Sequence, residues 1–284
     1  MKKILVLLLS GLCFLSEAQI ETPAPSPAGM VSSKVGLTDV KVTYSRPKMK
    51  GRKIFGAGAD YLVPFGELWR TGANNGTIVS FSDDVKVGGK DVKKGEYLLF
   101  TTPNQSEWSV MLYSDLSIGG NTGAYNKEKE VVNVSVKSGK LNEKVETFTV
   151  GISDITDDNT GANIELSWEN TSVKIPVTVD FDSKVMKSIE AGTKVNPGNL
   201  IAAANYYFDN KKDMKQAITW MEQGIAQGNP NAFWNINRLA QMKKAAGDKA
   251  GALAAANKSL ELAKKAENDF GYIKQNEDLI KSLK

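Results

Sequence analysis

Histidine is absent from the 284-residue sequence, and cysteine occurs only once, as Cys13. Without histidine the chain cannot form a Ser-His-Asp triad or a Cys-His pair, and it offers no imidazole to zinc or haem iron. A single cysteine cannot form a disulfide within the chain. Acid–base chemistry is therefore left to aspartate, glutamate, lysine and tyrosine, and we expect no metal ion and no organic cofactor.

The one cysteine lies in an N-terminal segment that has the pattern of an export signal. Two lysines precede an apolar run over residues 4–15, and Ala18 is the small residue that signal peptidase prefers. We expect residues 1–18 to be a signal peptide cleaved before Gln19, which predicts a periplasmic or secreted protein. Acylation of Cys13 is the alternative, but Leu12 stands where lipoproteins carry a small residue.

Net charge and the length of the apolar run argue against nucleic-acid binding and against a transmembrane helix. The chain has 36 Lys and Arg residues against 32 Asp and Glu, a net charge of +4, which is not the strongly basic footprint of a nucleic-acid-binding protein. A transmembrane helix requires roughly 17 to 25 apolar residues, more than the N-terminal run provides. We therefore expect no nucleic acid and no transmembrane segment.

The segment after the signal is rich in proline and small residues. Residues 19–33 include prolines at positions 23, 25 and 27. Proline fixes φ, and segments of this kind are stiff and extended. We expect residues 19–33 to be a tether in front of the folded domains.

Residues 34–181 alternate short apolar runs with clusters of Gly, Asn, Asp and Pro, which is typical of antiparallel sheet. About eight or nine such runs, with no helical period between most of them, predict an antiparallel β-sandwich or a barrel-like variant. The expected strands are residues 40–44, 77–81, 85–87, 97–100, 108–113, 131–136, 148–152, 164–168 and 173–179.

The pattern becomes helical after Phe181. Residues 182–196 predict a linker with a short helix, and residues 197–284 are rich in alanine, with apolar residues at helical spacing. Ala217-Ile218 recurs 35 positions later as Ala252-Leu253, close to the 34-residue period of tetratricopeptide hairpins. The tail resembles about two such repeats and a capping helix, which implies an all-α helical-hairpin domain and a protein or peptide partner.

The most distinctive motifs lie between Tyr44 and Trp108. They are Tyr44-Ser45-Arg46-Pro47, Lys50-Gly51-Arg52, Trp69-Arg70-Thr71-Gly72-Ala73-Asn74, the run from Gly95 to Pro103, and Glu107-Trp108. On these motifs the chain resembles the bacterial family called domain of unknown function 2911, over about residues 26–179. The resemblance implies a small exported β-rich domain, found alone or ahead of helical repeats. It implies no activity, because none is established for the family.

One stretch departs from the family pattern. Between Asp115 and Tyr125 relatives commonly have a Trp-Gly pair, whereas this chain reads Ile118-Gly119-Gly120. A site built around that tryptophan would therefore lack its indole here.

The same motifs suggest a ligand site rich in guanidinium, amide and indole groups. Arginine offers a rigid five-donor fork for carboxylate, phosphate or sulfate, and a tryptophan beside it could stack on a sugar or aromatic ring. The hypothesis is an anionic or carbohydrate ligand in the β domain. The candidate residues are Arg46, Arg52, Glu67, Trp69, Arg70 and Asn74. The alternative is structural: Glu67 pairs with an arginine, Trp69 fills the core, and the glycines serve turns.

Two groups of carboxylates raise the alternatives of glycoside hydrolysis and metal binding. Glycosidases need only two carboxyl groups, about 5 to 10 Å apart. The candidates by neighbourhood are Asp60, Glu67, Glu96 and Glu107. A second acidic group, Asp154, Asp157 and Asp158 before Gly161, offers oxygen ligands, but its spacing does not fit an EF-hand loop and a solvated turn is the simpler interpretation.

The sequence thus predicts an exported two-domain protein of the cell envelope. The favoured function is non-catalytic ligand or protein binding, or scaffolding, because no recognisable catalytic set is present. The alternative is a carboxylate-dependent, glycosidase-like hydrolase acting in the periplasm.

Overall fold

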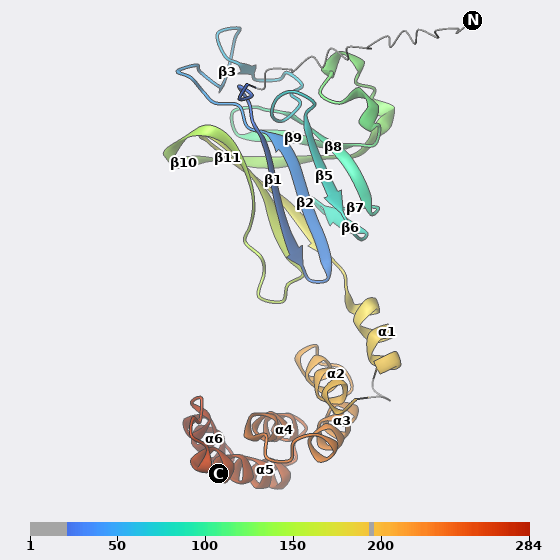
Figure 1. Cartoon of the computed structure of the whole chain (residues 1–284), viewed down its shortest axis with the longest axis vertical. Helices are drawn as coiled ribbons and strands as arrows, with labels where there is room; N and C mark the ends of the chain where they lie inside the picture. The colour runs from blue at the N-terminus through green and yellow to red at the C-terminus, as the bar shows by residue number, and fades with distance from the viewer. Residues whose placement is uncertain (1–21, 193–195) are drawn as a thin grey trace, which may run out of the picture. The chain divides into compact units, whose positions relative to one another are not determined.

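The computed structural model describes residues 22–192 and 196–284. The expected signal peptide, residues 1–18, lies outside the described residues, as does the start of the tether. The chain divides into two compact units between Asp180 and Phe181 (Figure 1). The first unit is antiparallel sheet and the second is helical, which confirms the predicted order of a β domain followed by an all-α domain.

The first unit contains a nine-stranded sheet in the order β1-β2-β5-β8-β9-β10-β11-β6-β7. Every neighbouring pair in it is antiparallel. A separate parallel pair joins β3 (Phe55–Gly56) to β4 (Val63–Pro64). The strands of the large sheet are β1 (Ala28–Val35), β2 (Thr38–Ser45), β5 (Thr77–Phe81), β6 (Val85–Val87), β7 (Lys90–Val92), β8 (Gly95–Thr102), β9 (Glu107–Tyr113), β10 (Glu130–Ser153) and β11 (Gly161–Val179).

The long strands β10 and β11 curve across β1 and β2 (Figure 1), so that the sheet folds back on itself. The hydroxyl of Tyr44 on β2 accepts a hydrogen bond of 3.0 Å from the Val150 amide on β10. Just beyond β2, Lys48 forms an antiparallel bridge with Thr147. The aromatic core, made of Trp69, Trp108, Phe148 and Trp168 with Phe55 against them, fills the space between these layers. It gives the sandwich-like form that the strand pattern predicts.

Strands β8 and β9 are covered on both faces. One face carries Trp108 of the aromatic core, and the other carries Leu98, Phe100, Met111 and Tyr113, against which Ile118 and Tyr125 pack. The segment between β9 and β10 covers this second face. It contains three short 3-10 helices, η1 (Leu116–Ile118), η2 (Thr122–Ala124) and η3 (Lys127–Lys129). Burial on both faces explains why residues 97–100 and 110–113 are uninterrupted apolar runs.

Residues 28–33, which we expected in the tether, instead belong to β1. This strand pairs with β2 along its whole length, from Ala28 opposite Ser45 to Val35 opposite Thr38. Its alternate side chains are only half-buried, so the apolar pattern is weak. Backbone hydrogen bonds to β2 stabilise the strand, and these are not visible in local composition.

The described residues of the second unit, 181–192 and 196–284, form six helices. They are α1 (Asp182–Gly192), α2 (Pro197–Asp209), α3 (Met214–Gln227), α4 (Phe233–Ala245), α5 (Lys249–Lys265) and α6 (Tyr272–Ser282). Helix α2 packs on α3, α4 on α5, and α5 on α6. Their core contains Met221 and Met242, together with small alanines that bring the helices close.

Helices α3 and α5 begin in the same way, 35 residues apart. The carboxylate of Asp213 accepts a hydrogen bond from the Gln216 amide at 3.0 Å, and that of Asp248 accepts one from the Gly251 amide at 2.8 Å. Each of these bonds pairs one of the backbone N–H groups that have no acceptor within the first turn of a helix. Four residues after each cap lies a fully buried alanine, Ala217 or Ala252. No helix in either described range is long and apolar enough to span a bilayer.

Candidate functional site

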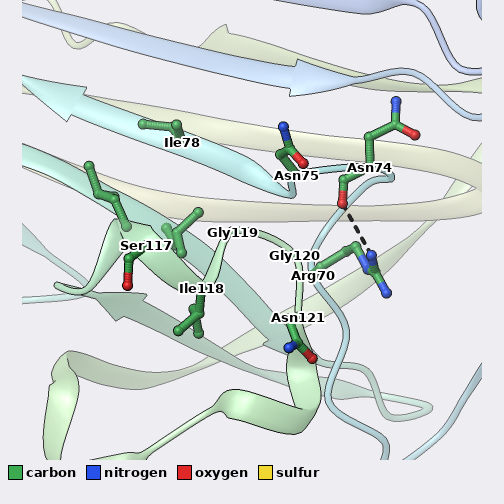
Figure 2. A pocket seen from close by; sticks show the side chains of 11 residues that line it. Arg70, Asn74, Asn75, Ile78, Ser117, Ile118, Gly119, Gly120 and Asn121 are labelled. Atoms are coloured by element: carbon green, nitrogen blue, oxygen red, sulfur yellow. Dashed lines mark hydrogen bonds between the residues drawn. The ribbon is translucent and has the colours of Figure 1, made fainter.

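A cavity of about 670 Å3 in the β-rich unit lies beside Arg70 (Figure 2). We call it the Arg70 cavity. Its volume is within the range of about 300 to 1,000 Å3 that small-molecule sites occupy. Its walls come from the loop before β5, from β5 and β8, and from the segment around η1. The lining residues are Arg70, Asn74, Asn75, Ile78, Leu98, Leu116, Ser117, Ile118, Gly119, Gly120 and Asn121.

Arg70 is held at this place by a tightly wound loop. The preceding residue, Trp69, pairs through its backbone with Thr101 of β8, which fixes the start of the loop. The chain then turns sharply, with positive φ at Thr71, Gly72 and Asn74. The turn brings the Asn74 carbonyl to Nη1 of Arg70, which donates a hydrogen bond of 3.1 Å to it.

Gly120 is the residue that allows this arrangement. A Cβ atom on Gly120 would lie 2.3 Å from the Asn74 carbonyl oxygen and 2.8 Å from Cδ of Arg70. Real Cβ atoms do not approach other atoms this closely, so a larger residue would displace the loop or the guanidinium. The stretch Ile118-Gly119-Gly120 therefore forms part of one wall of the Arg70 cavity.

The cavity has a polar end and an apolar end. Figure 2 shows Arg70, Asn74 and Asn121 at one end and Ile78 and Ile118 at the other. Ile78 of β5 lies directly opposite Leu98 of β8 in the sheet register, so the two apolar side chains share one face. The arrangement suits a ligand that has one polar group and one apolar part.

The side chain of Asn74 has a structural task. Its Nδ2 donates hydrogen bonds of 3.1 Å to Oγ of Ser45 and 3.3 Å to the carbonyl oxygen of Ser26. Its carbonyl meanwhile positions Arg70. Asn74 thus ties the loop to the end of β2 and to the segment before β1.

The polar end carries uncompensated positive charge. No aspartate or glutamate is among the residues that line the Arg70 cavity, and within the described chain the Arg70 guanidinium forms no ion pair. Asp115, which precedes the wall residue Leu116 and does not itself line the cavity, accepts hydrogen bonds from the Ser117 hydroxyl at 2.6 Å and the Ser117 amide at 3.0 Å. These bonds lower the pKa of Asp115 and fix the start of η1.

Tyr125 anchors the same segment. Its hydroxyl donates a hydrogen bond of 2.9 Å to Glu130, and its ring stacks on Tyr113 with centroids 4.8 Å apart. Burial raises the pKa of Tyr125, and the contact with Glu130 raises it further. The phenol stays protonated, so it acts as an anchor for the cavity wall.

Trp69 lies in the core, with 9% of its surface exposed. Its ring stacks on Trp168 with centroids 5.9 Å apart, and Phe55, Trp108 and Phe148 surround it edge-on. Its Nε1 donates a hydrogen bond of 3.2 Å to the Gly72 carbonyl. The face of Trp69 is covered, so the structural alternative, and not ligand stacking, describes this residue.

Arg46 and Arg52 also have structural contacts. Nη2 of Arg46 donates a hydrogen bond of 3.2 Å to Thr149, while its stem packs against Gly29. Arg52 turns back on its own loop, donating to the carbonyl oxygens of Met49 at 2.9 Å and Lys48 at 2.6 Å. Neither arginine lines the Arg70 cavity.

A second cavity of about 390 Å3 shares Arg70 and Asn74 with the Arg70 cavity. Its lining also includes Arg52, Trp69 and Trp168. Of the six predicted residues, Arg52, Trp69, Arg70 and Asn74 therefore meet around this smaller space, whereas Arg46 and Glu67 line neither cavity.

The candidate carboxylates do not converge on either cavity. Glu67 is exposed, and no hydrogen bond or ion pair of its carboxylate occurs within the described ranges, so the expected pairing with an arginine is not seen. Glu96 accepts a hydrogen bond of 2.9 Å from Ser80 on the surface of the sheet. Asp60 and Glu107 line neither space.

The acidic group before Gly161 forms the turn between β10 and β11. Asp158 accepts hydrogen bonds from Thr156 and Thr160, and these lower its pKa to about 2. Asp154 bonds to Asn163 at 2.9 Å and to Lys174 at 2.7 Å. Their carboxylates are engaged within the hairpin, and no cluster of three or more potential metal ligands occurs in the part of the chain that the structure describes.

Sequence reasoning missed the far wall of the Arg70 cavity. Asn75, Ile78 and Leu98 read as ordinary loop and strand residues, and the stretch from Ser117 to Asn121 reads as a loop. The only local signal was the pair Gly119-Gly120, which permits close approach. Its partner, Arg70, lies about fifty residues away, and only the fold brings them together.

The fold and the cavity define a β-rich domain with a pocket of small-molecule size, followed by a helical domain. Residues 26–177, more than half of the chain, match the model of the family described as "Protein of unknown function (DUF2911)". The chain belongs to this family. No curated protein and no solved structure matches it.

Proposed function

We propose that the chain is a non-catalytic binding protein of the cell envelope, and that its β-rich domain binds a small anionic ligand in the Arg70 cavity. One observation carries this proposal: the Arg70 guanidinium borders a cavity of about 670 Å3 and has no acidic partner in the described chain. A fixed cation that lacks a protein counter-charge favours an anion, and guanidinium binds carboxylates and phosphates through paired hydrogen bonds.

The experiment is a calorimetric titration of the purified exported chain with glucuronate, octanoate, inorganic phosphate and sulfate. We expect at least one anion to bind, and Arg70→Gln to weaken that binding by about tenfold or more, because a hydrogen bond to a charged group is lost. Lys137→Gln removes one exposed positive charge from the same unit and serves as the matched control. Failure of all four anions to bind, or equal weakening in both variants, would contradict the proposal.

The geometry supports binding better than hydrolysis. A glycosidase needs two carboxyl groups that face one substrate, and neither cavity beside Arg70 is lined by Asp or Glu. Turnover of a glycan by the purified protein would restore the hydrolase alternative.

For the helical unit we propose a tetratricopeptide-like scaffold that binds a peptide segment. The repeated cap and buried alanine of α3 and α5 support the repeat assignment. A largely apolar groove of about 460 Å3, formed by α3, α4 and α5, supports the binding role. Crosslinking of a peptide library to the full chain, compared with Ala255→Glu in this groove, tests it: peptides that crosslink equally well to both proteins would argue against the groove.

Export remains a proposal that rests on residues 1–18. Its test is the N-terminal sequence of the protein recovered from the cell envelope or medium. A mature chain that begins at Gln19 supports cleavage by signal peptidase, whereas a chain that keeps Met1 in the cytoplasm would overturn the proposal.

A further inference from the structure

We propose that the ligand of the Arg70 cavity is an amphipathic monocarboxylate, with its carboxylate on Arg70 and its aliphatic chain over Ile78, Leu116 and Ile118. This inference rests on the proposed function, because it names the class of ligand for the same cavity. It follows from the donors and the single cation at the polar end, and from the apolar wall at the other end.

The polar end offers donors and a single cation. Nη1 of Arg70 is engaged by the Asn74 carbonyl, so this bond orients the guanidinium while its Nε and Nη2 have no acceptor within the described chain. Asn121 uses only its Oδ1, which accepts from the Gly123 amide at 3.1 Å, and its Nδ2 is left to donate. A carboxylate, which accepts several hydrogen bonds in one plane, matches this set of donors.

The apolar end is a continuous surface made by two layers. Ile78 on β5 and Ile118 of the covering segment are partly buried, and both pack against the cluster that contains the buried Leu98 of β8. Leu116 extends this surface towards solvent, with 38% of its surface exposed. Methylene groups placed here would leave water, and each should raise the affinity about fourfold.

The same surface argues against an acidic sugar. Every ring hydroxyl needs a hydrogen-bond partner when it is buried, and the isoleucine and leucine side chains supply none. A phosphate dianion is also a poor match, because Arg70 is the only charged residue among those that line the cavity. One negative charge joined to an apolar chain satisfies both ends.

Gly119 and Gly120 leave the middle of the cavity open. Gly119 has φ of +51°, which residues with a Cβ rarely adopt, and Gly120 lies against Arg70. At these two positions the wall between Arg70 and Ile118 is backbone alone (Figure 2).

The test is a calorimetric series with acetate, hexanoate, octanoate, octan-1-ol and glucuronate against the full exported chain. We expect affinity to rise about tenfold from hexanoate to octanoate, since two methylenes are added. Octan-1-ol, which has the chain without the charge, should bind at least about tenfold more weakly than octanoate. Glucuronate should bind more weakly than octanoate.

Two variants separate the two ends. Arg70→Gln should weaken octanoate by about tenfold or more while leaving octan-1-ol unchanged. Leu116→Ser should reduce octanoate affinity by about threefold or more and leave acetate unchanged, because only the chain contacts residue 116. Thermal unfolding of both variants verifies that they are folded, and Arg70→Lys, which keeps the charge and loses the planar fork, should give intermediate affinity.

The outcomes distinguish this inference from the function on which it rests. Arg70-dependent binding of glucuronate or phosphate, with no gain from hexanoate to octanoate, would overturn the amphipathic ligand and leave an anion-binding cavity. Binding of none of these anions would overturn both. Octanoate binding that survives Arg70→Gln would place the fatty chain elsewhere and also overturn the inference.

Discussion

Nδ2 of Asn237 donates a hydrogen bond of 2.8 Å to Oδ1 of Asn276 and so joins helix α4 to helix α6. Both carboxamides are buried. Asn276 in turn donates to Ser259 of α5 at 2.9 Å, and the Ser259 hydroxyl donates to the Phe233 carbonyl at 2.7 Å. A polar network thus links three helices inside the second unit, where an unpaired group would be costly.

Asn276→Ala is expected to lower the free energy of unfolding by about 1 to 3 kcal/mol, because the carboxamide of Asn237 loses its acceptor while it remains buried. Urea unfolding of the full chain, followed by far-UV circular dichroism, measures the loss. Asn257→Ala on the exposed face of α5 is the control and should change stability by no more than about 0.5 kcal/mol. Equal effects of the two substitutions would mean that the network does not stabilise the helical unit.

Gly120→Ala is expected to destabilise the β-rich unit and to displace Arg70, because the new Cβ would lie 2.3 Å from the Asn74 carbonyl oxygen. The measurements are the unfolding temperature and the affinity for the anion that binds the wild-type chain. Gly151→Ala, where an added Cβ meets nothing within 4 Å, is the matched control. A Gly120→Ala protein with unchanged stability and affinity would contradict the close approach to Arg70.

Trp69→Ala is expected to cost about 3 to 5 kcal/mol of unfolding free energy, the usual loss for a large aromatic side chain in a core. Trp234→Ala is the comparison, because Trp234 is 44% exposed and its removal should change stability little. Denaturant unfolding measures both. If Trp69→Ala kept wild-type stability and lost only ligand binding, the indole would belong to the ligand site after all.

Asp158→Ala is expected to destabilise the protein at neutral pH and to have a smaller effect in acid. Hydrogen bonds from Thr156 and Thr160 lower the pKa of Asp158 to about 2, from 3.8, so the folded state favours the carboxylate. The stabilisation is complete above pH 3.8 and is lost as the pH falls through 2. The measurement is the difference in unfolding temperature between wild-type and variant from pH 6 to pH 2. Asp157→Ala, at an exposed neighbour, is the control, and a difference that does not change with pH would refute the prediction.

Most elements could be predicted from local pattern. The strands at Thr77–Phe81 and Val85–Val87 have alternating burial, and the helix starts at Asp213 and Asp248 have capping residues that act within one turn. Strand β1 could not be predicted, because hydrogen bonds to β2 stabilise it and its own apolar alternation is weak.

The candidate site divides in the same way. Trp69, Arg70 and Asn74 lie together in one motif, so the sequence identifies them as a group. Composition alone does not show which of them is buried and which borders a cavity. Burial places Trp69 in the core, and the turn of the loop places Arg70 on the cavity. The side chain of Trp69 is therefore buried, whereas that of its neighbour Arg70 borders a cavity.

The sequence by itself determined the order of a β domain and a helical domain, the absence of imidazole chemistry, and the family. These depend on composition, periodicity and contiguous motifs. Only the tertiary structure decided which arginine borders a cavity, and what faces it. The reason is that the opposite wall, Ile78 and Leu98 with residues 116–121, is brought to Arg70 by strand pairing and by the covering segment. Contacts between residues far apart in sequence leave no local pattern.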